Sequence, residues 1–499
     1  MSRALVDSFV QRLAILATVA TLLGGAFVAD AAAQLVPVRT VPVASGDQFL
    51  LLPSSTLGMG GVHLAVDDSL GDPWSQPAKG VMIEESSFLG SPTFYSISDR
   101  GGAGRAFPIA GLFTGERWFG GVSLAMQQID NSNGGQIWVD PFIDWVGPAR
   151  RLGDVSSRNL YTSGFVGTRL GEQWSIGMAA SSAHLDAMDG VDLLYARADR
   201  IEQSGGVQDL RVGLYRTSDR DRLSVSLIHN RVSMTHDVSY VDVVWNDPMS
   251  PPMAISRIEV NEDKTRTWGA EAIWERELSA PGWRIATSGT VNRKSHPKIP
   301  NYEIQNIPRD PGTTWAYEAG LGLARTRNAT TFGLDIVLQP IWSETWQEAD
   351  QVETTSSGKT LAIGDRTIDN DFVFMNVMLR AGLSHRIDDV EFQTGLEVRS
   401  YDYELDQTDH IAETQRDQHE SWMEWTPTLG ATFHFADVEL RYSGRLTTGT
   451  GRPGTAARWD DAVAAPLESG DFIVAPNAPL TLQDASVLTH RIAIRVPIR

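Results

Sequence analysis

The sequence predicts an all-β protein, a transmembrane antiparallel β-barrel of about 14–16 strands. Three observations lead to this fold class: long stretches in which apolar and polar residues alternate, connections that are short and long in turn, and tryptophans at the ends of the expected strands. Beyond its first residues the chain has no run of about 18 apolar residues, so no membrane helix is expected. In a membrane strand every second residue is polar, and this averages the hydropathy away.

The hairpin from Phe372 to Tyr403 shows the alternation most clearly. In its second arm, after an Asp388-Asp389 turn, the apolar side holds Val390, Phe392, Leu396 and Val398, and the polar side holds Glu391, Gln393, Glu397 and Arg399. A period of two is the period of a strand. Each arm has roughly 14 residues, whereas a strand usually has about 5–6 and a tilted strand that crosses a bilayer needs about 9–11. The hairpin is therefore interpreted as one unit of a closed membrane barrel.

The connections between the expected strands alternate in length. Short connections fall near positions 115–116, 170–172, 218–221, 278–282, 326–328, 387–389 and 436. Long connections span the regions 129–157, 184–206, 232–263, 294–312, 343–369, 404–419 and 448–485. Short turns on one side and long loops on the other are typical of outer-membrane barrels. The pattern gives about sixteen strands, from near Ile83–Ile97 to Leu488–Ile498, with both ends of the wall on the periplasmic side.

Composition and the N-terminus narrow the class of protein. The chain has 499 residues, a formal net charge of -20 and no Cys. The negative balance argues against nucleic acid as a partner, and the lack of Cys excludes a disulfide framework. Residues 1–33 are interpreted as a signal peptide, because Arg3 and Arg12 accompany the apolar stretch Leu13–Val28 and an A-x-A site follows at Ala31–Ala33. A leader on a strand-rich chain indicates a multi-pass protein of the bacterial outer membrane, or, less favoured, a secreted β-sandwich.

Tryptophans are expected to mark the two membrane interfaces, because an indole ring is apolar while its N–H prefers water. Trp118, Trp174 and Trp283 each begin a strand directly after a short turn. The tryptophans beside long connections are Trp315, Trp342, Trp346, Trp422 and Trp425.

Charged residues in the expected strands are assigned to the lumen, since a charge on the lipid face at mid-membrane costs about 2–4 kcal/mol. The lumen-facing set is Asp335, Glu391, Glu397, Arg399, Glu439, Arg441, Arg445, Arg491 and Arg495. Such a set either lines a water path or anchors a plug through salt bridges, and the second interpretation is favoured, since a barrel this wide holds water unless something fills it.

The run LGMGGVHLAVDDSLGDPWSQPAKG resembles the N-terminal signature of the FadL-type and PorV-type outer-membrane proteins. In that signature a GMGGA motif is followed by alternating apolar residues, an Asp-Asp pair and an Asn-Pro-Ala-Gly step. Here the Gly-Met-Gly-Gly and Asp-Asp parts match, Gln76 replaces the Asn, and Lys79 intervenes before Gly80. The resemblance implies that residues 34–80 form a plug, the hatch, inside a barrel wall of residues 81–499, and that the wall has fourteen strands. The alternative is a flexible glycine turn before the first strand.

The resemblance also implies a function, the passive uptake of hydrophobic, fatty-acid-like small molecules. The outer loops would capture the compound, the hatch would move, and the compound would leave sideways through the wall. The hatch residues this implies are Gly58, Gly60 and Gly61 for close backbone packing, and Asp67, Asp68 and Pro77 for the inner turn. Two alternatives stay open: a PorV-like barrel whose external loops hold a protein partner, and a general porin with the N-terminal segment outside the lumen.

No catalytic residue, metal site or cofactor is expected, because no Ser-His-acid set and no zinc spacing is evident. The stretch Asp402–Glu420 is expected to be an external loop kept soluble by its charge. Binding of a divalent cation, or cation bridging to lipopolysaccharide phosphates, is the less favoured alternative. Its acidic residues are Asp402, Glu404, Asp406, Asp409, Glu413, Asp417 and Glu420.

Overall fold

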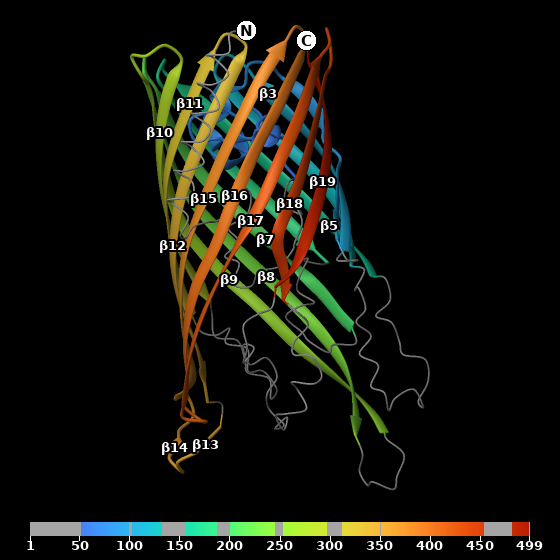
Figure 1. The fold of residues 1–499 in the computed structure, drawn as a ribbon, viewed down its shortest axis with the longest axis vertical. Coiled ribbons are helices and arrows are strands. Elements are labelled where there is room, and N and C mark those ends of the chain that lie inside the picture. Colours follow the sequence, from blue (N-terminus) through green and yellow to red (C-terminus); the bar gives the residue numbers. More distant parts are fainter. Residues whose placement is uncertain are drawn as a thin grey trace, which may run out of the picture.

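The protein is a closed antiparallel β-barrel with sixteen wall strands (Figure 1). The computed structural model describes residues 51–98, 102–131, 155–186, 200–244, 253–296, 312–349, 351–453 and 482–498. The wall consists of β1 (Ser87–Gly90), β2 (Thr93–Ile97), β3 (Gly102–Thr114), β4 (Trp118–Asn131), β5 (Val155–Leu170), β6 (Trp174–Leu185), β7 (Arg200–Thr217), β8 (Asp221–Val244), β9 (Met253–Glu277), β10 (Trp283–His296), β11 (Gly312–Arg327), β12 (Thr330–Glu348), β15 (Arg366–Ile387), β16 (Val390–Asp409), β17 (Thr414–His434), β18 (Glu439–Pro453) and β19 (Leu482–Pro497). The sixteen strands agree with the count from the sequence and differ from the fourteen that the resemblance implies.

β1 and β2 are two halves of one wall strand, and both pair with β3 and with β19. Ser91 and Pro92 separate the two halves. Proline has no N–H, so it can only accept in the ladder. The Pro92 carbonyl accepts from the Ile492 N–H at 3.0 Å, and the Ser91 N–H donates to the Pro108 carbonyl at 3.0 Å. The wall therefore closes, with an interruption at this position.

All seven short connections predicted from the sequence are confirmed as turns between neighbouring strands. Two of them contain a non-glycine residue in the left-handed region, Asn328 (φ 53°) and Asp388 (φ 50°), and these residue types tolerate that conformation best after glycine. Ser87 of β1 pairs with Pro497 of β19, so the wall begins and ends at the short-turn end.

Three of the regions predicted as long loops are largely strand, and this part of the prediction is wrong. β8 and β9 continue to Val244 and from Met253, and only the turn 410–413 separates β16 from β17. The region 343–369 contains the ends of β12 and β15 and a small hairpin of β13 (Glu353–Thr354) and β14 (Thr360–Leu361). Outside a bilayer a strand needs no apolar face, so its alternation weakens and the sequence looks like a loop.

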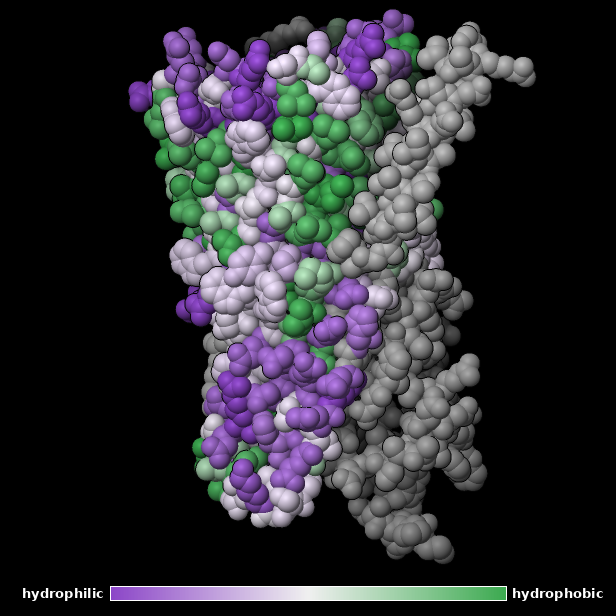
Figure 2. Space-filling view, turned by 60° about the vertical axis from the view of Figure 1, so that its left-hand side comes forward, coloured by the Kyte–Doolittle hydropathy of each residue, from purple (hydrophilic) through white to green (hydrophobic). Residues whose placement is uncertain are grey.

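The outer surface divides into an apolar and a hydrophilic half. Figure 2 shows hydrophobic residues gathered on the half nearer the short turns and hydrophilic residues on the other half. Exposed apolar side chains alternate with inward ones along the strands, as in β19, where Leu488, Ile492, Ile494 and Val496 are exposed and Arg491 is buried. A band of exposed apolar side chains on a closed wall is typical of a transmembrane barrel.

Two levels of tryptophan border this band where β10 pairs with β11. Trp283 begins β10 at the short-turn end, and Arg293, ten residues further along, pairs with Trp315 of β11. Trp315 in turn pairs with Trp342 of β12, and both are exposed. Ten residues match the roughly 9–11 that a tilted strand needs to cross a bilayer. The two predicted tryptophan levels are therefore present on this side of the wall.

Residues 51–83 are not part of the wall. They contain η1 (Leu57–Met59), α2 (Asp72–Ser75) and η2 (Pro77–Met82), and they lie within the barrel near its short-turn end (Figure 1). None of the described helices is long and apolar enough to cross a membrane. We call residues 51–83 the inner segment. The predicted signal peptide, and residues 34–50 of the predicted hatch, lie outside the described residues.

Candidate functional site

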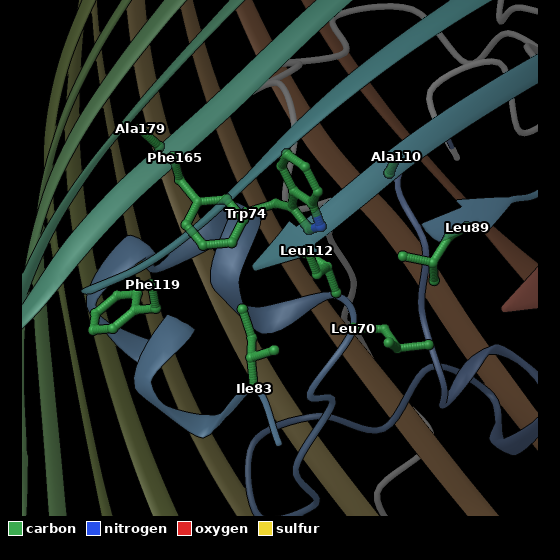
Figure 3. Packing of buried hydrophobic residues seen from close by; sticks show 9 residues of the cluster. All are labelled: Leu70, Trp74, Ile83, Leu89, Ala110, Leu112, Phe119, Phe165 and Ala179. Atoms are coloured by element: carbon green, nitrogen blue, oxygen red, sulfur yellow. The ribbon is translucent and has the colours of Figure 1, made fainter. Parts of the chain in front are cut away.

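The candidate site is the contact between the inner segment and the inward face of the wall. Its apolar part centres on Trp74 of α2, which packs edge-on against Phe165 of β5 with ring centroids 4.9 Å apart. Figure 3 shows Trp74 between Phe165 and Leu112, with Phe119 and Ile83 close by. Aromatic rings bury much apolar surface, so this cluster fixes one end of the inner segment to β3–β6.

Two of the three glycines predicted for close packing, Gly58 and Gly60, lie where the backbone meets the opposite part of the wall, whereas a Cβ on Gly61 would meet only the Arg380 side chain, at 3.7 Å. A Cβ on Gly58 would lie 2.8 Å from the Gly430 Cα of β17. Gly60 and Gly61 both have a φ of 72°, which favours glycine. The Gly60 N–H donates to Thr428 Oγ1 of β17 at 2.8 Å. The segment thus follows the wall at backbone distance.

The glycine contact makes a prediction about Gly395 of β16. A Cβ there would lie 2.2 Å from both the Gly60 nitrogen and the Met59 carbonyl carbon, which are backbone atoms. Such overpacking costs about 1–3 kcal/mol. Gly395→Ala should therefore raise amide hydrogen exchange across residues 57–64 by about tenfold or more. Gly289→Ala in β10 is the matched control, since nothing lies within 4 Å of that Cβ, and equal exchange in the two variants would refute the contact.

Asp67 anchors the inner segment to two wall strands. Its Oδ1 lies 2.8 Å from Arg222 Nη1 of β8, and its Oδ2 lies 2.9 Å from Arg284 Nη1 of β10. Burial opposes ionisation, but the Arg284 and Arg222 guanidiniums outweigh it and lower the pKa of Asp67. Asp68 instead closes a turn inside the segment, accepting from Ser55 N at 2.9 Å.

Lys79 extends this network in a buried position. Its Nζ lies 3.0 Å from Asp72 Oδ2 and 3.4 Å from Glu275 Oε1 of β9, and the side chains of Lys79 and Glu275 are 5% and 3% exposed. Burial opposes the charge on Lys79, but Asp72 and Glu275 outweigh it and raise its pKa. Glu275 Oε2 also lies 3.6 Å from Arg222 Nη1, so the Lys79 and Asp67 contacts form one network.

Earlier in the segment, His63 contacts two of the wall's charged residues, Asp335 and Arg380. Asp335 of β12, 1% exposed, accepts from His63 N at 2.8 Å and Leu64 N at 3.3 Å. Arg380 Nη1 lies 2.9 Å from His63 Nδ1. Arginine can only donate, so Nδ1 accepts and the imidazole is neutral with its proton on Nε2. Burial, Arg380 and Lys79 together lower the pKa of His63 to about 3.

The neutral His63 gives a pH prediction. A docked pKa near 3 against 6.5 in water means that the docked segment loses stability as pH falls below 6.5. Asp72, whose pKa burial raises to about 7, responds in the opposite sense. We therefore expect the contribution of His63 to docking, taken as the difference between the wild type and His63→Gln, to fall by up to about 25-fold from pH 7 to pH 5. Amide exchange of residues 60–66 at both pH values measures it, and identical pH profiles would exclude this role.

The other predicted lumen charges also lie on the inward face, and some of them gather around Glu397. Around Glu397, Arg380 Nε and Arg399 Nη2 each lie at 2.7 Å and Arg445 Nη2 at 3.4 Å. The remaining residues contact their neighbours as follows: Glu391 with Ser384 and Gln393, Glu439 with Arg441 and His434, Arg491 with the Leu52 carbonyl and Ser91, and Arg495 with Glu85.

Pro77 begins η2 and lies against β6, where a Cβ on Gly177 would lie 2.6 Å from the Pro77 carbonyl carbon.

Four residues of the site were not predicted from the sequence: Asp72, Lys79, Glu275 and Arg380. Lys79 had one signal, because it interrupts the family signature just before Gly80. The other three could be found only from the pairing of distant strands.

A pocket lies between the inner segment and β4–β7. The segment contributes Leu51, Leu52 and Trp74. The wall contributes mainly small side chains, serines and alanines, together with Tyr161 and Val207. The ion pair of Asp209 and Arg211 lines one side. The pocket is mostly apolar, and its volume of about 40 Å³ means that a compound of benzene size enters only when the inner segment moves.

No protein-family model and no curated protein matches the chain. Among solved structures, the chain is similar to a Pseudomonas aeruginosa FadL homologue at 12% identity and a TM-score of 0.40, covering 90% of this chain and 99% of that one. It is similar to the CymD monoaromatic hydrocarbon channel (11%, TM-score 0.40, covering 89% and 97%) and to the Ralstonia pickettii toluene transporter TbuX (11%, TM-score 0.39, covering 89% and 97%). At these values the likeness concerns the barrel alone.

Proposed function

We propose that the protein takes up small hydrophobic compounds passively across the outer membrane, with the inner segment as a movable plug. The observation that carries the proposal is the apolar pocket between that segment and the wall. A compound bound there contacts both parts at once. Its affinity therefore changes if the segment moves, and this is the condition for a ligand to shift a conformational equilibrium.

The interruption in the first wall strand supplies a place for sideways release. Arg491 of β19 donates through Nη2 to the Leu52 carbonyl and, at 2.9 Å, to Ser91 Oγ. It therefore joins the inner segment to the wall at the interruption. Withdrawal of the segment would remove one of these bonds from a place where the ladder already lacks a donor, Pro92.

Uptake by whole cells tests this function, because the lipopolysaccharide leaflet slows the entry of hydrophobic compounds. Cells that make the full chain should take up labelled ethylbenzene faster than cells without it, while sucrose entry stays unchanged. Equal ethylbenzene uptake would overturn the proposal. Rapid swelling of proteoliposomes in sucrose would instead identify a general porin, and a stoichiometric protein recovered with the tagged barrel would identify a PorV-like partner barrel.

A further inference from the structure

On its wall side, the pocket is lined by a row of serines from neighbouring strands. Strand pairing places Ser123 of β4 opposite Ser163 of β5, and Ser163 opposite Ser181 of β6. Ser181 in turn pairs with Asp209 of β7. All four residues line the pocket. Residues directly opposite in an antiparallel pair lie about 4.5–5.5 Å apart, so the three hydroxyls form one row across three strands.

Apolar residues border this row on the adjacent level of the wall. Two positions along each strand, Ala125 pairs with Tyr161, Tyr161 with Ala183, and Ala183 with Val207. These four residues also line the pocket. The Tyr161 hydroxyl is already engaged, since it donates to Gln127 Oε1 at 2.7 Å, so the ring alone is available. The wall side of the pocket therefore has a row of apolar side chains next to the row of serine hydroxyls.

The serine hydroxyls are available to a ligand. Within the described residues, no hydrogen bond joins the hydroxyl of Ser123, Ser163 or Ser181 to another side chain or to a backbone group. A serine hydroxyl both donates and accepts, so the row suits a hydroxyl or a carbonyl group equally. A purely apolar compound would leave these hydroxyls covered without a partner, which costs about 1–3 kcal/mol per group.

The charges beside the row cancel. Arg211 Nε lies 2.7 Å from Asp209 Oδ1, and the two residues are 7% and 3% exposed. Arg211 Nη1 donates to the Ser75 carbonyl at 3.2 Å, and Asn230 Nδ2 donates to Asp209 Oδ2 at 3.3 Å. A carboxylate in the pocket would meet Asp209 as well as Arg211. The site therefore offers no net charge to an anion or a cation.

Resting on the uptake function proposed above, we infer that the pocket selects small, uncharged, mostly apolar compounds that carry one hydroxyl or carbonyl group. The apolar part of the compound contacts Ala125, Tyr161 and Ala183 of the wall, and Leu52 and Trp74 of the inner segment. The polar group meets the serine row. Carboxylates, including fatty acids, bind less well at this pocket.

Three probes of nearly equal size test this class: acetophenone, ethylbenzene and benzoate, which differ in one substituent. Dissociation constants are measured by equilibrium dialysis on the purified full chain in detergent micelles. The variant S123A/S163A/S181A should weaken acetophenone binding by about three- to tenfold and strengthen ethylbenzene binding, because it removes hydroxyls that ethylbenzene would cover without a partner. Thr162→Ala is the matched control, because Thr162 neighbours Ser163 on the same strand but is exposed on the other face.

Charge selection is tested with Asp209→Asn, which keeps the size of the side chain and leaves Arg211 without its counter-charge. This variant should bind benzoate at least about tenfold more tightly than the wild type, because the site then carries a net positive charge. Ethylbenzene binding reports in each variant that the pocket is still formed.

The outcomes separate the inference from the function on which it rests. If the serine variant weakens the binding of acetophenone and of ethylbenzene alike, or changes the binding of neither compound, the inferred ligand class is wrong. The proposed uptake function is not affected by that result. An unchanged benzoate constant in Asp209→Asn likewise overturns the neutral site. If no probe binds the wild type and no uptake is seen in cells, the proposed function itself fails.

Discussion

Deletion of residues 34–80 should convert the closed barrel into an open, ion-conducting pore. Barrels of sixteen to eighteen strands leave an aqueous channel when nothing fills them. The inner segment occupies part of this lumen and holds its place through buried contacts with β8–β10, β12 and β15–β17. Removal of the segment leaves wall strands whose pairing does not depend on it.

Single-channel recording in planar bilayers measures this effect. The conductance of the deletion variant should exceed that of the full chain by about tenfold or more, with steady openings in place of rare ones. Heat-modifiable migration on a gel, compared between the two proteins, shows that the wall is still folded. A folded deletion variant with the conductance of the full chain would mean that the inner segment does not close the lumen.

The faces of the wall could be predicted because membrane strands obey one rule. In β19 the alternation predicts that Arg491 faces the lumen; Arg491 is buried, while Leu488, Ile492 and Ile494 on the opposite face are exposed. The same rule fails beyond the bilayer. Asp402–Glu420 looked like an acidic loop, yet β16 and β17 continue through it except for the turn 410–413, and no metal-binding group is found among the described residues. Outside the membrane, alternation is not enforced by lipid.

The candidate site was predicted less completely than the wall. Gly58 and Gly60 could be assigned to close packing from their motif. The residues that they meet, such as Gly395 and Gly430, depend on which strand lies opposite and at which register. The serine row is the clearest case. Ser123, Ser163 and Ser181 are unremarkable in their own strands and form a site only through the pairing of β4, β5 and β6.

The second large effect is expected at Lys79. Its Nζ stands between the carboxylates of Asp72 and Glu275, and all three side chains are at most 10% exposed. Lys79→Met keeps the length of the side chain but leaves the buried Asp72 carboxylate without its counter-charge, and it leaves Glu275 with only Arg222 and Arg284, at 3.6 and 3.8 Å. Removing one partner of a buried pair costs about 3–5 kcal/mol, so the inner segment should leave its place far more often.

Amide exchange across residues 72–83, recorded on the full chain in micelles, measures this cost directly. The expected increase in exchange rate is about a hundredfold or more, since 1.36 kcal/mol corresponds to a factor of ten. Lys264→Met is the matched control: its side chain is 44% exposed and pairs with Glu262, so a change of at most about threefold is expected. The double variant K79M/D72N should recover part of the loss, because it removes one unpaired carboxylate. If Lys79→Met exchanges like Lys264→Met, the buried network does not hold the inner segment, and its other contacts, the Trp74 cluster and the close packing of Gly58 and Gly60, hold it instead.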